Sequence, residues 1–304
     1  MNKLTNILYL INSKSNDNKA WNFWKKARKK YPVLPVDPID ITTINLDMLI
    51  AKKNPELIVI AGGDGTINSV CNSVYRMKKK PVLSILPMGF GNALSYCLGV
   101  ETMEKAIDVL KNKSESITID MMKTNTKDNK IGVFIVSVGF AARILLQREN
   151  YRYIGYGSYL ISILQSLFSH PENEITFTID HTTKLSATAA QLVISNCPVI
   201  GLNYVTAPRA LLNDGFLDCT LFSTKYASLT SLRLKGFKHP LYSELGKVNF
   251  KAKHIRIEGE PMVQIDGDPI YHKEGLEIEI IPSVITFLRN KDESIIQEYL
   301  PFIK

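Results

Sequence analysis

Short apolar runs alternate with helix-like patterns in the first part of the chain. The runs are Ile7–Ile11, Leu57–Ala61 and Val82–Leu86, each five residues long and rich in Ile, Leu and Val. Such runs are typical of buried parallel strands, and the segments between them place apolar residues on one helical face. A short strand is also predicted at 40–43 and a helix at 46–52. This alternation predicts a parallel α/β sheet, whose ligand crevice lies at the carboxyl ends of its strands.

In the rest of the chain the pattern changes to many strands joined by Gly, Asn and Pro turns. Helices are predicted at 142–148 and 156–168. The predicted strands are 117–122, 131–138, 174–179, 191–195, 216–222, 248–258, 262–265 and 276–281. This pattern is typical of an antiparallel sandwich. We therefore expect an α/β domain at 1–122 and a β-sandwich at 123–290, with 291–304 as a candidate segment for returning to the first domain.

Two glycine turns follow the second and third apolar runs. They are Gly62-Gly63-Asp64-Gly65-Thr66 and Pro87-Met88-Gly89-Phe90-Gly91-Asn92. Glycine lets a ligand approach the main chain, and the helix start after each turn offers N–H groups to an anion such as phosphate. A carboxylate at Asp64 would be repelled there unless it binds Mg²⁺, positions a hydroxyl or accepts a proton, which are the parts of a phosphoryl transfer. The simplest alternative is a Gly-Asp-Gly surface turn, and Asn92 suits a helix cap, a ligand contact or both.

Composition and charge narrow the class of protein. The net charge of +8 and the pI near 9.1 favour anionic partners. Four cysteines show no metal-ligand spacing, which indicates reduced thiols in a cytoplasmic protein: Cys71, Cys97, Cys197 and Cys219. No segment approaches the roughly 18 apolar residues of a membrane span, so we expect only peripheral membrane contact. A Walker loop, a His-Glu-x-x-His motif and a Gly-x-Ser-x-Gly motif are all absent from the sequence.

The two glycine motifs, extended to Leu86-Pro-Met-Gly-Phe-Gly-Asn-Ala93, resemble the catalytic domain shared by diacylglycerol kinases, sphingosine kinases and bacterial lipid kinases. The Gly-Asn-Ala at 91–93 is closer to the sphingosine kinases. The resemblance continues in order through the motifs at 139–140, 151–155, 207–218 and 264–268. It implies an amino-terminal domain like that of NAD kinases and phosphofructokinases, a carboxyl-terminal β-sandwich, and ATP in the cleft between them. It also implies transfer of the ATP γ-phosphoryl group to a lipid hydroxyl with Mg²⁺.

The resemblance assigns roles to residues by their motifs. Asp64 and Asp266 are the two candidate catalytic bases, and Asp214 and Asp218 match an acidic pair near a metal site. The nucleotide-binding set that it implies is Asn12, Thr43, Gly62, Gly63, Gly65, Thr66, Gly89, Gly91, Asn92, Arg152 and Asp268. Without the resemblance, the Asp-Gly pairs in the second half would simply predict hairpin turns.

The chain departs from the family pattern at three places. The first loop has Asn12-Ser13 where relatives often have Asn-Pro and glycines, and Asp268 replaces a glutamate. Arg143 follows Gly139-Phe140, where sphingosine kinases place aspartates that meet a cationic head group. A cationic amino alcohol would lose its counter-charge there, so Arg143 favours a neutral or anionic lipid.

The leading hypothesis is therefore an ATP-dependent lipid kinase that phosphorylates a lipid of the sphingoid-base or diacylglycerol type. One alternative is an NAD kinase-like enzyme, although the Asn-Glu motif of NAD kinases is not evident. The other is a catalytically degenerate protein that binds a nucleotide or a lipid. The expected partners are a lipid substrate and a membrane surface, with no nucleic acid. The oligomeric state is left open, with a homodimer as one option.

Overall fold

The computed structural model describes residues 6–89, 91–111, 114–128, 130–149, 161–162, 165, 173–200, 204–229, 245–259, 261–272 and 274–291. Arg152, most of the helix predicted at 156–168 and the segment 292–304 lie outside the described residues. The chain divides into two compact units, Met1–Asp120 together with Pro282–Lys304, and Met121–Ile281. We call them unit 1 and unit 2. No helix of the described residues is both long and apolar enough to cross a membrane.

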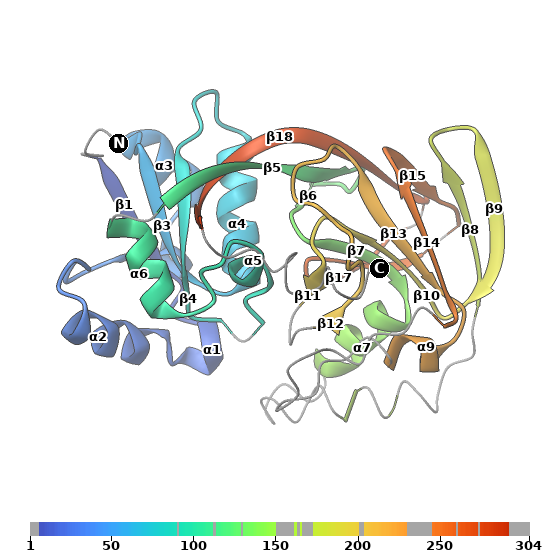
Figure 1. The fold of residues 1–304 in the computed structure, drawn as a ribbon, viewed down its shortest axis with the longest axis horizontal. Helices are drawn as coiled ribbons and strands as arrows, with labels where there is room; N and C mark the ends of the chain where they lie inside the picture. The colour runs from blue at the N-terminus through green and yellow to red at the C-terminus, as the bar shows by residue number, and fades with distance from the viewer. Residues whose placement is uncertain are drawn as a thin grey trace. The chain divides into compact units, whose positions relative to one another are not determined.

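Unit 1 is built on a parallel sheet (Figure 1). The strands lie in the order β2 (Ile39–Asp40), β1 (Ile7–Ile11), β3 (Leu57–Gly62) and β4 (Val82–Pro87), and each pair is parallel. All six residues of β3 are buried, as the continuous apolar run predicts. Parallel pairing brings the carboxyl ends of β1, β3 and β4 to the same edge of the sheet. The predicted parallel α/β sheet is confirmed.

Helices connect and cover these strands. Their bounds are α1 Ser15–Asn18, α2 Ala20–Lys30, α3 Leu46–Lys53, α4 Asp64–Tyr75, α5 Ala93–Cys97 and α6 Met103–Lys111. The helices α2 and α4 pack on β3, and α6 packs on β4. The predicted strand at 40–43 is wrong except at Asp40, because the Asp40 side chain accepts the Thr42 N–H at 3.0 Å and a 3-10 turn, Ile41–Thr43, begins there.

Unit 2 is a sandwich of two antiparallel sheets, as the sequence predicts. One sheet has the order β14-β13-β10-β7-β16-β17, and the other includes β18, β15, β8 and β9 as neighbours. The bounds are β7 Ile135–Gly139, β8 Asn173–Ile179, β9 Thr183–Ala189, β10 Gln191–Ser195, β13 Leu217–Phe222, β14 Lys247–Ala252, β15 His254–Ile257, β16 Met262–Ile265, β17 Asp268–Tyr271 and β18 Leu276–Asn290. Smaller elements are β6 Ile131–Gly132, β11 Val199–Ile200, β12 Tyr204–Val205, α7 Phe140–Glu149 and α9 Lys225–Leu229. The apolar core contains residues of both sheets, among them Ile194 of β10 and Ile278 of β18.

Several strands differ from the prediction, and the predicted strand 131–138 is two strands, β6 and β7, which belong to different sheets. The run 248–258 is two strands, β14 and β15, which belong to different sheets and are separated by Lys253. The predicted strand 276–281 continues to Asn290 as β18. Its first residues pair with β15, and Phe287 pairs with Leu83 of β4. The chain thus enters unit 1 again at Pro282, before the expected boundary at 290, because the first residues of β18 belong to unit 2 and the rest belong to unit 1. The strand β5 (Ser114–Thr124) passes from unit 1 into unit 2 in the same way.

Candidate active site

The two glycine turns touch each other at the carboxyl ends of β3 and β4. A Cβ atom added to Gly63 would lie 2.7 Å from the Cα of Gly89, and one added to Gly89 would lie 2.2 Å from the Cα of Gly63. Side chains essentially never approach a backbone atom so closely, so only glycine fits at either position. The Met88 N–H also donates to the Gly62 carbonyl at 3.0 Å. The structure therefore brings the two predicted phosphate turns into direct backbone contact.

Asn92 holds the second turn in shape. Its side-chain oxygen accepts the Gly89 N–H at 3.0 Å, and its amide nitrogen donates to the Gly89 carbonyl at 2.9 Å. The backbone of Asn92 is left-handed, with φ of 49°, and the residue directly precedes α5. Among the described residues its side chain makes no capping hydrogen bond to that helix, so the predicted cap is not formed. Gly91 lies half-buried in the bend beside it.

Asp64 is the first residue of α4 and lies next to the contact between the two turns. Gly63 precedes the helix, and its carbonyl accepts the N–H groups of Thr66 at 2.9 Å and Ile67 at 3.0 Å. A carboxylate in a first helical turn is favoured by the helix dipole. Gly65 is exposed, and a Cβ added to it would meet no described atom within 4 Å apart from those of its chain neighbours and the backbone of its own helix. The side of Gly65 is therefore open to a ligand.

Thr66 connects this turn to the loop that follows β1. Its hydroxyl oxygen accepts a hydrogen bond from the Asn12 side-chain amide at 3.0 Å and lies 3.2 Å from the Ser15 hydroxyl. A Cβ added to Gly62 would lie 2.5 Å from the same oxygen. Asn12, Gly62 and Thr66 of the predicted set are thus brought together. Ser15 joins them without having been singled out, although the polar loop that contains it is evident in the sequence.

Thr43 does not join this cluster. Its hydroxyl donates to the Asp40 carbonyl at 3.1 Å, and in the described part of the chain no hydrogen bond connects it to the glycine turns. The neighbouring Thr42 lies closer to the first loop, with its hydroxyl 3.1 Å from that of Ser13. Burial would raise the pKa of Asp40, but hydrogen bonds from Ser13 and Thr42 lower it overall. The contact of Asp40 with the Ser13 N–H, at 3.3 Å, fixes this loop.

In unit 2, Asp214 and Asp218 are brought together around a lysine. The Lys251 ammonium lies 2.5 Å from Asp214 and 3.6 Å from Asp218, and Lys251 faces Asp218 across the β13–β14 pair. Burial raises the pKa of Asp218 to about 6; Lys251 opposes the shift and the nearby Asp214 adds to it. Asp214 also accepts the Phe216 N–H at 3.1 Å, which shapes the turn.

This acidic pair does not fit a resident metal ion. An ammonium group occupies the position between the two carboxylates that a cation would take. The described residues contain no group of three His, Cys, Asp or Glu side chains that could hold a metal. The sequence alone gives little indication of Lys251. The lysine lies opposite Asp218 only because β13 and β14 pair in the observed register.

Asp266 holds the backbone of unit 2. Its buried carboxylate accepts the N–H groups of Val133 at 2.6 Å, Phe134 at 2.8 Å and Ile135 at 2.9 Å. These three hydrogen bonds commit the carboxylate to holding the backbone of residues 133–135. Asp268 is exposed and forms an ion pair with Lys130.

Comparisons with known proteins agree with this architecture. Residues 6–124 match the family model of the diacylglycerol kinase catalytic domain. Residues 134–289 match that of the YegS C-terminal NAD kinase beta sandwich-like domain. These two matches cover both halves of the chain in the expected order.

Individual relatives lead to the same family. A Staphylococcus haemolyticus protein, whose name places it among candidate lipid kinases, is 25% identical over 254 residues, which cover 80% of this chain and 80% of the relative. A "Probable lipid kinase YegS-like" of Shewanella frigidimarina is 24% identical over 76% of this chain and 75% of its own.

Among solved structures, the crystal structure of a diacylglycerol kinase from Bacillus anthracis has the same fold. It superposes with a TM-score of 0.69 at 20% identity, over 96% of this chain and 99% of that one. The protein therefore belongs to the lipid kinase family that joins a diacylglycerol kinase catalytic domain to a YegS-type β-sandwich, and it is a phosphotransferase with an alcohol group as acceptor.

Proposed function

We propose that the protein transfers the γ-phosphoryl group of ATP to a hydroxyl group of a lipid. The observation that carries this proposal is the direct contact between Gly63 and Gly89, with Asp64 beside it at the start of α4. Membership of a kinase family supports ATP as the donor. The names of the relatives, which are lipid and diacylglycerol kinases, support a lipid as the acceptor.

The residues of unit 1 fit the phosphates of a nucleotide. The absence of side chains at Gly63 and Gly89 exposes main chain, and the open side of Gly65 leaves room for a ligand. The N–H groups at the beginning of α4 favour an anion there. When bound, ATP supplies the phosphoryl group and the charge that these groups stabilise. Asn92 keeps the Gly89 turn rigid, and Asn12 with Thr66 holds the loop after β1 in place.

We assign the role of orienting the acceptor hydroxyl and receiving its proton to Asp64. Its carboxylate lies at the first turn of α4, next to the proposed phosphate position. Asp266, the other candidate base, is committed to three backbone N–H groups and acts as a positioning residue for the chain between β6 and β7. Catalysis then rests on charge stabilisation and orientation, as is general for phosphoryl transfer.

Magnesium at the Asp214–Asp218 pair is not part of this proposal, because Lys251 already neutralises that pair. Mg²⁺ bound to ATP would neutralise part of the charge of its phosphates. Roles for Arg152 in phosphate binding and for Asp268 in nucleotide binding stay predictions.

We infer that the protein meets its substrate at a membrane surface. The helix α2 exposes five basic side chains and contains no acidic residue: Lys25, Lys26, Arg28, Lys29 and Lys30. Such a cationic surface is attracted to anionic lipids by roughly 1 kcal/mol per basic residue. Co-sedimentation with phosphatidylglycerol vesicles should exceed that with phosphatidylcholine vesicles, and a double substitution Lys25→Gln and Lys26→Gln should reduce it. Equal sedimentation with both vesicles would contradict a role for this charge.

The kinase proposal is tested with radiolabelled ATP and Mg²⁺ against diacylglycerol, monoacylglycerol, sphingosine, phytosphingosine, ceramide and NAD. Asp64→Asn is the test variant. Asp108→Asn, which removes the same charge from an exposed position of α6, is the matched control. We expect label in a lipid with the wild type and with Asp108→Asn, and none with Asp64→Asn. Label in NAD alone would establish the NAD kinase alternative. ATP binding without transfer to any acceptor would favour the degenerate binding protein.

A further inference from the structure

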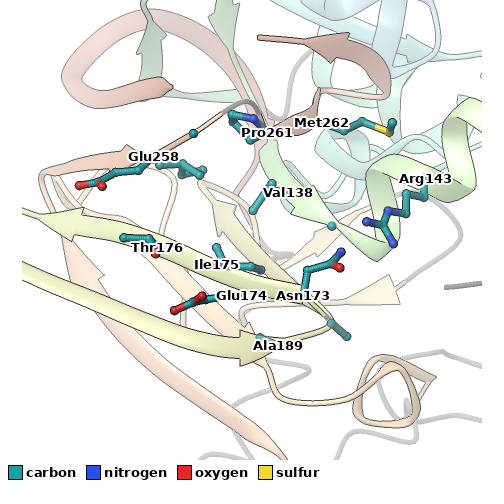
Figure 2. Close-up of a pocket in the computed structure, with 14 residues that line it drawn as sticks. Val138, Arg143, Asn173, Glu174, Ile175, Thr176, Ala189, Glu258, Pro261 and Met262 are labelled. Atoms are coloured by element: carbon teal, nitrogen blue, oxygen red, sulfur yellow. The ribbon is translucent and has the colours of Figure 1, made fainter. Parts of the chain in front are cut away.

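A pocket of about 310 Å³ opens between the two sheets of unit 2 (Figure 2). One wall comes from β7 and β16, the other from β8, β9 and β15, and the start of α7 closes one end. The described residues that line it all belong to unit 2. The volume has room for on the order of ten methylene-sized groups, which suits a single alkyl chain or a small amphiphile.

The floor of this pocket is apolar. Val138, Ile175, Ala189 and Ile257 line it, and all four also belong to the buried core of the sandwich. Met262 adds a half-buried thioether side chain at its side. A ligand with a hydrocarbon part would therefore place that part against surface that is continuous with the core. Each methylene group buried there contributes about 0.8 kcal/mol.

Arg143 supplies a cation at one end of the pocket. The residue is half-buried, and within the described residues its guanidinium makes no hydrogen bond or ion pair. In the view of Figure 2 the Arg143 guanidinium and the Asn173 amide lie at the same end, whereas the carboxylates of Glu174 and Glu258 point away from it. Glu258 is engaged elsewhere, since it accepts the Lys184 ammonium at 2.7 Å. The end at Arg143 is therefore suited to an anion.

The fold fixes the position of Arg143 through the start of α7. Gly139 has φ of 97°, and a Cβ added to it would lie 2.4 Å from the Ala190 carbonyl oxygen. The Phe140 N–H donates to that same carbonyl at 2.9 Å. The Ala141 N–H donates at 3.1 Å to the side chain of Gln191, which is fully buried. Arg143 follows two residues later, in the first turn of a helix whose start is anchored at two points.

We propose that this pocket binds an anionic amphiphile, with its hydrocarbon part on the apolar floor and its phosphate group on Arg143. The planar guanidinium matches phosphate through two parallel hydrogen bonds. The inference rests on the proposed function and names the substrate class: the acceptor lipid carries a phosphate in its head group, besides the hydroxyl that is phosphorylated. A cationic amino alcohol meets like charge at Arg143 and is disfavoured.

The test is calorimetric titration of the full chain with four probes below their micelle-forming concentrations. They are decanoyl lysophosphatidic acid, decanoylglycerol, decylamine and inorganic phosphate. We expect lysophosphatidic acid to bind more tightly than decanoylglycerol, and decylamine and inorganic phosphate to bind more weakly than either. Inorganic phosphate that binds as tightly as lysophosphatidic acid would overturn the proposal, because the hydrocarbon part of the lipid would then contribute nothing to its affinity. Decylamine that binds most tightly would also overturn it.

Variants separate the two parts of the pocket. Arg143→Gln should weaken lysophosphatidic acid roughly ten- to a hundred-fold, the cost of losing hydrogen bonds to a charged group, and leave decanoylglycerol unchanged. Arg143→Lys should restore part of the loss. Met262→Trp, which fills the pocket from its side, should weaken both lipids. Arg209→Gln is the matched control, since it removes the same charge from an exposed position of unit 2. Unchanged affinity in Arg143→Gln, with the wild-type melting temperature, would overturn the proposal.

Kinase activity measured on the same preparations separates this inference from the proposed function. Transfer of label from ATP to a lipid, without any preference for the phosphate-bearing probe, would refute only the proposal that the pocket binds an anionic amphiphile. Binding of lysophosphatidic acid that depends on Arg143, without transfer to any acceptor, would refute only the proposed kinase activity.

Discussion

Replacing Gly89 by alanine is expected to separate the two glycine turns. The new Cβ would lie 2.2 Å from the Cα of Gly63, which is about 1 Å short of the 3.4 Å at which ordinary van der Waals contact begins. It would also lie 2.8 Å from the side-chain oxygen of Asn92, which holds the turn. The backbone atom of Gly63 cannot swing aside as the end of a flexible side chain could. The strands β3 and β4, or the turns themselves, must therefore move apart.

The cost can be worked out from this overlap. Overpacking of about one methyl group costs typically 1–3 kcal/mol. In a unit of this size that lowers the melting temperature by roughly 2–12 °C. Gly63→Ala should cost less than Gly89→Ala, because its Cβ would lie 2.7 Å from the Cα of Gly89. Both variants should also lose affinity for ATP, because the proposed phosphate position is made from the displaced backbone.

Gly65→Ala is the matched comparison. Its Cβ meets no described atom within 4 Å outside its own helical turn, and the position is helical, where alanine is more stable than glycine by roughly 0.5–1 kcal/mol. The melting temperature should therefore stay equal or rise, while ATP affinity falls because the methyl group enters the open side of the turn. Thermal unfolding and calorimetric titration with ATP on the three variants measure both quantities. Wild-type stability and wild-type ATP affinity in Gly89→Ala would show that the two turns do not need to touch.

Three further variants test other parts of the site. Burial raises the pKa of Asp218 from 3.8 to about 6, so between these pH values the folded wild type binds more protons than the unfolded chain. The free energy of unfolding of the wild type should therefore fall by up to about 3 kcal/mol as the pH rises from 3.8 to 6. Urea unfolding measures this fall, and Asp218→Asn should remove it. A wild type with constant stability from pH 4 to 7 would contradict this burial. Lys251→Met should make the melting temperature rise with Mg²⁺, whereas the wild type should not respond; an equal response would show that the lysine does not replace a metal. Asn92→Ala should cost about 1–2 kcal/mol and weaken ATP binding through the loss of two hydrogen bonds to Gly89, and unchanged ATP affinity would exclude a role in shaping the turn.

The strands that position the proposed phosphate site could be predicted almost to the residue. β3 and the inner residues of β4 are buried on both faces, as their continuous apolar runs predict, whereas in β1 Ile7 is exposed and Tyr9 is half-buried. Since parallel strands end at one edge, the approach of the two glycine turns could be expected from topology alone. The direct contact between Gly63 and Gly89 could not, because it depends on how closely the two backbones pack.

The second unit was harder to predict because its strands are held by tertiary contacts. β9 was missed, since it is mostly exposed and has little apolar alternation to mark it. The run 248–258 was predicted as one strand, although it crosses from one sheet to the other at Lys253. Lys251 illustrates the same limit within the site: its approach to Asp218 follows from the pairing register of β13 and β14, which the local sequence does not encode.

The role proposed for Arg143 depends on both the sequence and the structure. The sequence identified it as an unexpected cation after Gly139-Phe140. The structure adds that it lines a pocket with an apolar floor and that, within the described residues, no side chain neutralises it. A residue that departs from its family's pattern thus becomes a specific hypothesis about the substrate.

The proposed lipid kinase activity is tested most directly by transfer of the ATP γ-phosphoryl group to a lipid by the purified full chain. Radiolabelled ATP, Mg²⁺ and the lipid panel are incubated with the wild type, Asp64→Asn and Asp108→Asn, and the lipid fraction is extracted and counted. We expect label in a lipid for the wild type and Asp108→Asn, and its loss in Asp64→Asn. Equal lipid labelling by Asp64→Asn, or no lipid labelling by a wild type that binds ATP, would contradict the proposed lipid kinase activity.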